Sequence, residues 1–157
     1  MKPEEAARQR IDEMLNEAGW IVQDRKEVNL EAGRGVAIRE FGLRSGTADY
    51  VLMVDGEAAG IVEAKPAGHS LVGVEEQSAK YRTGVGGNLP AARALLPFVY
   101  ETTGKETRFT SYLDPEPRSR QVFAFHRPEM LAQWLQLAPE EGANTTLRAF
   151  SRCRRCS

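Results

Sequence analysis

Apolar residues recur at helical spacing near both ends of the patterned part of the chain. From Glu4 to Ala18, apolar side chains three and four positions apart alternate with charged ones, and Gly19 follows. This pattern predicts an amphipathic helix that ends at the glycine. Pro128 stands where the first residue of a helix belongs and leads into Glu129–Leu137. We therefore expect one helix before and one helix after the central part of the chain.

The central part of the chain contains short apolar runs that are typical of β-strands. Asp55-Gly56 joins two of these runs and is the strongest hairpin signal in the sequence. Two further helices are predicted over Val74–Thr83 and Leu89–Leu96, on either side of a glycine-rich break. The order of elements predicts an α/β fold with a mixed central sheet flanked by helices. The expected strands begin with an element at Trp20–Val22 and continue with Val36–Phe41, Thr47–Val54, Ala58–Ala64, Phe98–Thr103, Thr107–Tyr112 and Val122–Phe125.

Length and composition fit one soluble globular domain. The chain has 157 residues, of which 41% are hydrophobic and 27% charged. The predicted elements lie within residues 1–138, and beyond Pro139 the pattern is lost, so we expect residues 139–157 to form a linker or a disordered tail. The apolar runs are far shorter than the roughly 20 residues of a membrane span, and the first residues lack the layout of a secretory signal. A cytoplasmic location without a membrane span is the expectation.

Charge and cysteine content give little direct indication of a partner. The formal net charge is −1, so any affinity for nucleic acid must come from a local site. Arg108, Arg118 and Arg120 are candidates for phosphate contacts, although a solvated basic loop is the favoured interpretation. Cys153 and Cys156 have the C-x-x-C spacing of half a zinc site or a redox pair. Because the other ligands and the strand-helix context are missing, we interpret them as part of a solvated tail.

Three charged residues near the predicted hairpin form the candidate chemical centre. Glu63 and Lys65 are two positions apart on one predicted strand, so their side chains project from the same face. Asp49 lies on the partner strand, and a turn at Asp55-Gly56 brings it back toward Glu63. Ile61 and Val62, which precede Glu63, are apolar. Charges at the end of a buried strand are costly unless they are paired or coordinated.

The chemistry of this set suits a hard divalent cation. Mg²⁺ keeps several waters and binds one or two protein carboxylates, here Asp49 and Glu63. Such an ion polarises a phosphodiester and activates water, while Lys65 would position the water and stabilise the developing negative charge. Without further signals, a surface salt bridge is the simpler interpretation of the same three residues. Glu4 or Glu5 could add a metal-shell carboxylate, although acids at a helix N-terminus are explained by the helix dipole.

The chain has two histidines, a residue type that often serves as a general base. His69 stands in a loop rich in proline and glycine, and His126 comes just before a predicted helix. Neither has an obvious acidic partner to orient its ring. Neither is therefore expected to belong to the catalytic centre.

The motifs resemble a known nuclease family. Asp49-x13-Glu63-Ala64-Lys65 resembles the PD-(D/E)xK nuclease core, and its flanks are similar to the N-terminal endonuclease domain of type I restriction enzyme R (HsdR) subunits. Gln77-x-x-x-Tyr81 resembles a second element that these subunits carry on the helix after the lysine strand. Segments around Phe98–Gly104 and Val122–Pro128 extend the resemblance to roughly residues 4–137. Two motifs in the right order are more specific than either alone.

The resemblance implies a function. It implies a restriction-endonuclease-like core that cleaves double-stranded DNA with Mg²⁺, with Asp49, Glu63 and Lys65 as catalytic residues and Gln77 and Tyr81 as DNA-binding or supporting residues. It also implies modification (M) and specificity (S) subunits as partners. Ala48 stands where the family's name has proline. No phosphate-binding loop of an ATP-driven motor occurs in the sequence, so we expect ATP to bind only the rest of a larger subunit.

Two alternatives stay open on sequence grounds. One is a stand-alone repair or junction-resolving nuclease with the same core, which a gene-neighbourhood search for a helicase region and methyltransferase genes would distinguish. The other is a non-catalytic module that docks on DNA or on other subunits. The complete set of Asp49, Glu63, Lys65, Gln77 and Tyr81 argues against the second alternative. An absence of divalent-metal binding would favour it.

Overall fold

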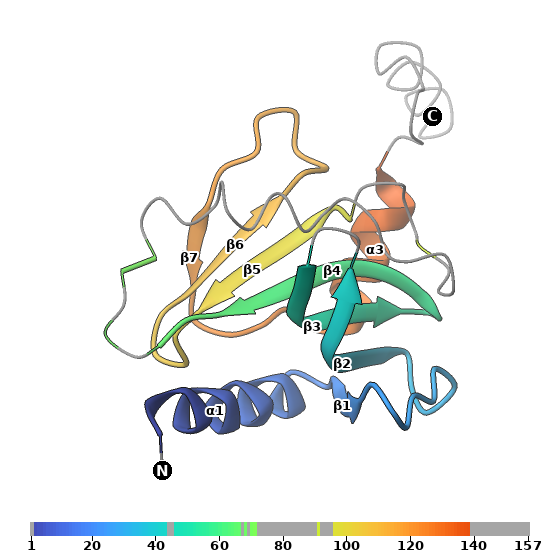
Figure 1. Cartoon of the computed structure of the whole chain (residues 1–157). Helices are drawn as coiled ribbons and strands as arrows, with labels where there is room; N and C mark the ends of the chain where they lie inside the picture. The colour runs from blue at the N-terminus through green and yellow to red at the C-terminus, as the bar shows by residue number, and fades with distance from the viewer. Residues whose placement is uncertain are drawn as a thin grey trace, which may run out of the picture.

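The computed structural model of the chain describes residues 2–43, 46–66, 68, 70–71, 91 and 96–138. Its centre is a seven-stranded sheet in which the strands lie in chain order (Figure 1). Two neighbouring pairs, β1/β2 and β4/β5, are parallel, and the others are antiparallel. The sheet is therefore mixed, as predicted. The strands are β1 Ile21–Asp24, β2 Gly35–Leu43, β3 Gly46–Val54, β4 Glu57–Ala64, β5 Phe98–Thr102, β6 Thr107–Ser111 and β7 Arg120–Val122.

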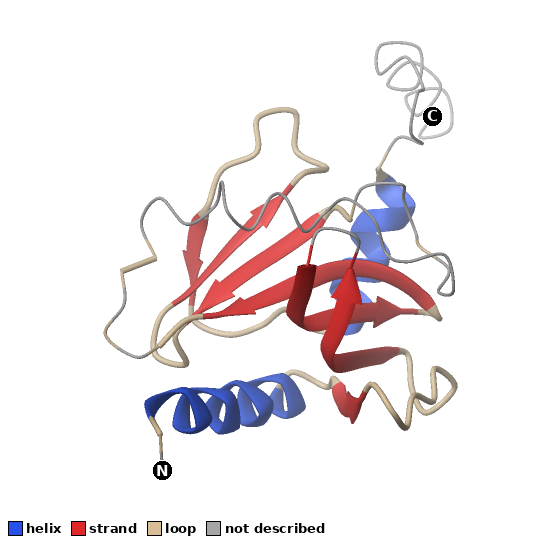
Figure 2. Ribbon diagram, in the orientation of Figure 1, coloured by secondary structure: helices blue, strands red, loops and turns tan. Residues whose placement is uncertain are grey.

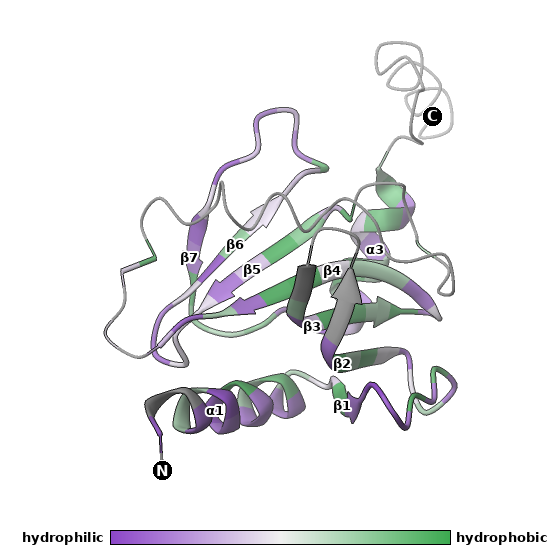
Figure 3. Cartoon of the chain, in the orientation of Figure 1, coloured by the Kyte–Doolittle hydropathy of each residue, from purple (hydrophilic) through white to green (hydrophobic). Residues whose placement is uncertain are grey.

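The helices α1 (Pro3–Glu17) and α3 (Pro128–Leu137) confirm both terminal predictions (Figure 2). Both pack on the same face of the sheet. Residues of both helices share one hydrophobic cluster with alternate strand residues, among them Ile11, Leu15, Tyr50, Leu52, Val62, Tyr100 and Leu131. The intervening strand residues form a second cluster on the opposite face, including Val36, Ile38, Val51, Met53, Ile61 and Val99. The central strands are thus buried on both faces, which explains their continuous apolar runs (Figure 3).

The predicted hairpin between β3 and β4 is confirmed. Asp55 and Gly56 have φ angles of 50° and 82°, and two consecutive residues with positive φ form the tight turn that matches strand twist. A register shift follows between Leu52 and Met53, because Met53 pairs with Ala58 whereas Leu52 pairs with Gly60. In unbroken register Asp49 would lie opposite Val62. The shift instead brings Asp49 level with Glu63, so the bulge is part of what assembles the site.

Gly60 shows how closely β4 approaches β5 just after this bulge. A Cβ atom at Gly60 would lie 2.7 Å from the backbone oxygen of Phe98. Gly60 and Phe98 are paired partners at the start of the parallel β4/β5 register. A side chain here would push apart the two strands that carry the candidate site, so glycine is required by close approach.

Two sequence predictions are wrong in part. Ala91 forms a parallel bridge with Ala58, so the helix predicted over Leu89–Leu96 does not hold at Ala91. The small residue pairs with the part of β4 that precedes the β4/β5 register. The strand predicted over Val122–Phe125 ends at Val122, because Val122 pairs with Thr107, the first residue of β6. Phe123 is consequently 96% exposed.

Several predictions fall on residues that the structure does not describe. These are the helix over Val74–Thr83 with Gln77 and Tyr81, the loop residue His69, and residues 139–157 with both cysteines. The domain boundary at residue 138 stays a prediction. Within the described part of the chain, no helix combines the length and apolar character that a membrane crossing needs.

Candidate active site

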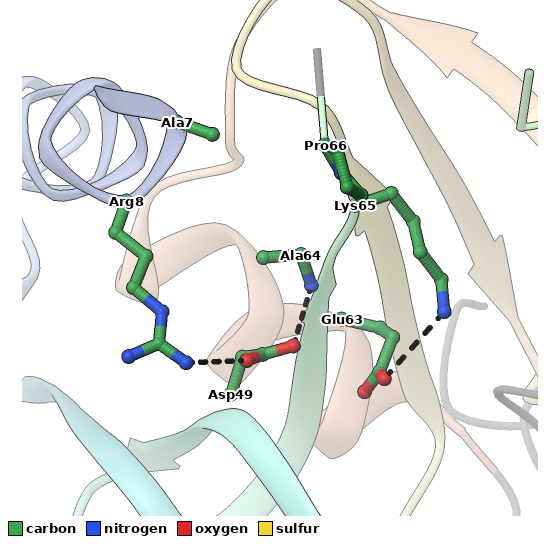
Figure 4. Close-up of a pocket in the computed structure, with 7 residues that line it drawn as sticks. All are labelled: Ala7, Arg8, Asp49, Glu63, Ala64, Lys65 and Pro66. Atoms are coloured by element: carbon green, nitrogen blue, oxygen red, sulfur yellow. Dashed lines mark hydrogen bonds and ion pairs between the residues drawn. The ribbon is translucent and has the colours of Figure 1, made fainter. Parts of the chain in front are cut away.

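A pocket of about 250 Å³ lies beside α1, where the first half of β3 meets the end of β4 (Figure 4). It brings together all three residues of the predicted centre. Their side chains are 20% exposed for Asp49, 12% for Glu63 and 22% for Lys65, so each is sheltered but reachable from solvent. The residues that line the pocket are Ala7, Arg8, Asp49, Glu63, Ala64, Lys65 and Pro66.

Strand β4 and the residue after it position Glu63 and Lys65 on one side. Figure 4 shows these side chains turned toward each other, with the Lys65 Nζ atom 3.9 Å from the Glu63 Oε1 atom. Ala64 points the other way and packs against the helix-side cluster. The Lys65 backbone N–H donates to the Thr102 oxygen at 2.8 Å, which continues the parallel pairing beyond the end of β4. Lys65 is therefore held by the sheet rather than by a loose loop.

Asp49 connects the two strands of the hairpin at the pocket. The Ala64 backbone N–H donates to its Oδ2 atom at 2.8 Å. This bond lies just past Tyr50 and Val62, the last pair of the β3/β4 register. The carboxylate is thereby fixed beside Glu63, with its second oxygen, Oδ1, directed toward α1.

Arg8 is a functional candidate that sequence reasoning missed. Its Nη2 atom lies 3.4 Å from Asp49 Oδ1, and its Nη1 atom donates to Glu40 Oε1. The hydrogen bond to Glu40 is the main cause that raises the pKa of Arg8, and attraction to Asp49 adds to it. Helical spacing predicts which side of α1 is apolar. It does not show which polar residue on the flank of the helix reaches the sheet.

Glu101 is a second residue that sequence reasoning passed over. It pairs with Glu63 across the parallel β4/β5 register and is 1% exposed. Paired residues on adjacent strands project to the same face, so the Glu101 side chain lies beside that of Glu63, which lines the pocket. The only sequence signal is one acid within the apolar run of β5.

Other candidates lie away from the pocket. Glu5 is exposed, and its Oε2 atom accepts a hydrogen bond from the Lys2 backbone. His126 is half-buried against Tyr100, whose hydroxyl lies 2.7 Å from its Nδ1 atom, and burial lowers the pKa of His126. Arg118 pairs with Glu116 at 3.3 Å. Glu5, His126 and Arg118 are not among the described residues that line the pocket.

Arg108 and Arg120 also lie away from the pocket, at the β6/β7 edge of the sheet. The Arg108 Nε atom donates to the Ser119 hydroxyl at 2.9 Å. Arg120 is exposed at the start of β7. Whether either side chain contacts a phosphate stays a prediction.

A partly buried polar network holds α1 in place beside the site. The Tyr50 hydroxyl donates to Asp12 Oδ1, and Arg39 Nη2 lies 2.6 Å from Asp12 Oδ2. Tyr50 is 2% exposed, and burial, followed by the Asp12 hydrogen bond, raises its pKa. The hydroxyl therefore stays a donor. Asp12 lies one turn after Arg8 on α1, so the network also fixes where Arg8 enters the pocket.

The donor set fits a magnesium ion with retained waters. Two carboxylates from adjacent strands face one pocket, and this number of protein ligands is what Mg²⁺ commonly uses. Within the described residues, no group of three or more histidine, cysteine, aspartate or glutamate side chains is arranged to hold a metal. Waters and substrate oxygens would therefore have to complete the coordination shell.

Comparison with known proteins places the chain in a family. Residues 22–111, more than half of the chain, match the family described as the second domain of the type I restriction enzyme EcoKI endonuclease subunit. No curated protein matches. A solved fragment described as an HsdR subunit of a type I restriction enzyme from Vibrio vulnificus YJ016 is 19% identical, with a TM-score of 0.61 over 86% of this chain and 25% of that one.

At that identity the solved fragment supports the fold alone, and the chain spans about a quarter of its length. The expectation of an α/β fold with a mixed central sheet and helices against it is confirmed. The match over residues 22–111 includes β3, β4 and the three residues of the predicted centre. The chain therefore belongs to the family of the type I restriction enzyme endonuclease subunit second domain.

Proposed function

We propose that this chain is a Mg²⁺-dependent endonuclease domain that hydrolyses phosphodiester bonds of double-stranded DNA. The observation that carries the proposal is the meeting of Asp49, Glu63 and Lys65 around one pocket. Membership of a restriction endonuclease family supports the same reaction. We further propose that it acts in the cytoplasm within an R subunit, with M and S subunits supplying sequence recognition.

Asp49 and Glu63 would hold the metal ion, and the hydrogen bond from Ala64 fixes the first of these ligands. When bound, Mg²⁺ polarises the phosphodiester and lowers the pKa of a coordinated water. Asp49 lies on β3 and Glu63 on the adjacent strand β4, so little rearrangement is needed to form the metal site. Gln77 and Tyr81, outside the described residues, stay proposed as supporting residues.

Lys65 supplies the positive charge for the reaction. Its ammonium group is sheltered at the pocket and lies near Glu63, where it can orient a water and donate hydrogen bonds to a phosphate oxygen. Charge that develops on the phosphate is stabilised more strongly in a sheltered site than in bulk water. The backbone bond of Lys65 to Thr102 keeps this group in place.

The test is a nicking assay with supercoiled plasmid DNA and Mg²⁺. The parent protein should nick DNA, and Asp49→Asn, Glu63→Gln and Lys65→Ala should each lower the rate by about 100-fold or more. Lys26→Ala is the matched control, because Lys26 is exposed in the turn after β1. If the isolated chain is slow, the same variants are compared in the assembled R, M and S complex. Equal rates for the three site variants and the parent would refute the assignment.

A further inference from the structure

Arg8 faces the pocket from the side opposite Lys65 (Figure 4). It projects from α1, and its guanidinium group spans two carboxylates, Glu40 on β2 and Asp49 on β3. Among the described residues that line the pocket, Arg8 and Lys65 are the cations, and Asp49 and Glu63 are the anions. The charges of the pocket are therefore balanced while Arg8 is in place.

The ion pairs of Arg8 contribute little to the stability of the fold, so Arg8 can exchange these partners for another anion. The side chains of Arg8 and Glu40 are 48% and 51% exposed, and ion pairs at such exposure add little stability. The docking of α1 has its own support one turn later, where Asp12 accepts hydrogen bonds from buried Tyr50 and from Arg39. Arg8 can thus leave its partners without releasing the helix.

Glu40, the second partner of Arg8, has a backbone conformation that is unusual in a β-strand. It lies between the pairs Arg39/Tyr50 and Phe41/Ala48, which puts it level with Asp49, and its φ angle is 51°. A non-glycine residue in the left-handed region is uncommon in a strand and tends to occur near functional sites. Here the irregularity coincides with the carboxylate that keeps Arg8 beside Asp49.

The chemistry of the guanidinium group indicates the exchange partner. Its planar fork of N–H donors binds carboxylates and phosphates with the same geometry. Arg8 and a divalent cation are both positive, and both would bind the Asp49 carboxylate. Because like charges repel, Arg8 must leave the Oδ1 atom when a cation binds there. A phosphate of the DNA backbone is then the anion for the freed group.

We propose that Arg8 is a phosphate-binding residue of this site, and that it stays paired with Asp49 and Glu40 until metal and DNA bind. The inference rests on the proposed nuclease function. It assigns to α1 a contact with the DNA backbone beside the cleavage site. It also makes Arg8 a competitor of the metal ion for Asp49.

The experiment measures DNA and metal affinity without cleavage. Fluorescence anisotropy with a labelled duplex in Ca²⁺ should show about tenfold weaker binding for Arg8→Gln and Arg8→Ala, and a salt dependence reduced by about one phosphate contact. Calorimetry without DNA should show equal or tighter Ca²⁺ binding by the same variants. Arg34→Ala is the matched control, since Arg34 is 44% exposed and pairs with Asp55 at the far end of the hairpin.

The two readouts separate this proposal from the proposed function. If Arg8→Gln and Arg8→Ala bind DNA with the parent's affinity and salt dependence, or bind Ca²⁺ more weakly, the role of Arg8 is overturned while the nuclease function stands. If the parent chain binds neither Ca²⁺ nor DNA, both proposals fail. Thermal unfolding followed by circular dichroism verifies that the variants are folded, and Arg8→Gln keeps a polar side chain in case Arg8→Ala is unstable.

Discussion

The hydrogen bond between Tyr50 and Asp12 is predicted to be a main attachment of α1 to the sheet. Tyr50→Phe removes a bond to a charged group without changing the packing of the ring, and such bonds contribute about 1.5–3 kcal/mol. Asp12→Ala removes the same bond and also the pair with Arg39, which is 39% exposed and adds about 0.2–1 kcal/mol at most. The losses expected in free energy of unfolding are therefore about 2 kcal/mol for Tyr50→Phe and about 2–4 kcal/mol for Asp12→Ala.

The double variant Asp12→Ala/Tyr50→Phe tests whether the two residues stabilise the protein through the same hydrogen bond. Once Asp12 is absent, the buried Tyr50 hydroxyl has lost its charged acceptor, so removing the hydroxyl as well should cost little or nothing more. Urea unfolding of the parent, both single variants and the double variant should give a coupling energy of about 1–3 kcal/mol. Glu13→Ala, which removes a 65% exposed acid on the same helix, is the control and should change stability by less than about 0.5 kcal/mol. Additive single effects would refute the attachment.

Two further predictions follow from local packing and burial. Gly60→Ala places a Cβ atom 2.7 Å from the Phe98 oxygen and should destabilise the fold by about 1–3 kcal/mol in urea unfolding, and an unchanged midpoint would contradict the close approach. Burial lowers the pKa of His126 below the ordinary histidine value of about 6.5. At a pH just below about 6.5 the unfolded chain therefore binds a proton that the folded chain does not, so the free energy of unfolding decreases as the pH is lowered. His126→Gln should weaken this fall between about pH 7 and pH 5, and an identical pH dependence of unfolding would refute it.

Much of the sheet could be predicted because its central strands are buried on both faces. The runs that became β3, β4 and β5 are continuous and apolar, and Asp55-Gly56 has the residues that a tight turn requires. The end of β7 could not be predicted. Phe123 and Phe125 look like strand residues, but β6 has no residues left to pair with them, and pairing between distant segments is invisible to a local pattern.

The site was predictable to the extent that strand alternation determines it. Alternation places Glu63 and Lys65 on one side, and the hairpin returns Asp49 to the same end. The exact alignment of Asp49 with Glu63 depends on a bulge that the sequence does not reveal. Arg8 and Glu101 were missed because tertiary packing sets their positions: Arg8 reaches Asp49 from a helix flank, and Glu101 lies beside Glu63 on a neighbouring parallel strand.

If Asp49 and Glu63 form one divalent-metal site, calorimetric titration of the chain with Mg²⁺ will reveal it. The parent and Glu57→Gln, which changes an exposed acid at the start of β4, should both bind Mg²⁺, and Asp49→Asn and Glu63→Gln should each lose binding. Mg²⁺ binding by these two site variants at the parent's affinity would show that the two carboxylates do not form the metal site.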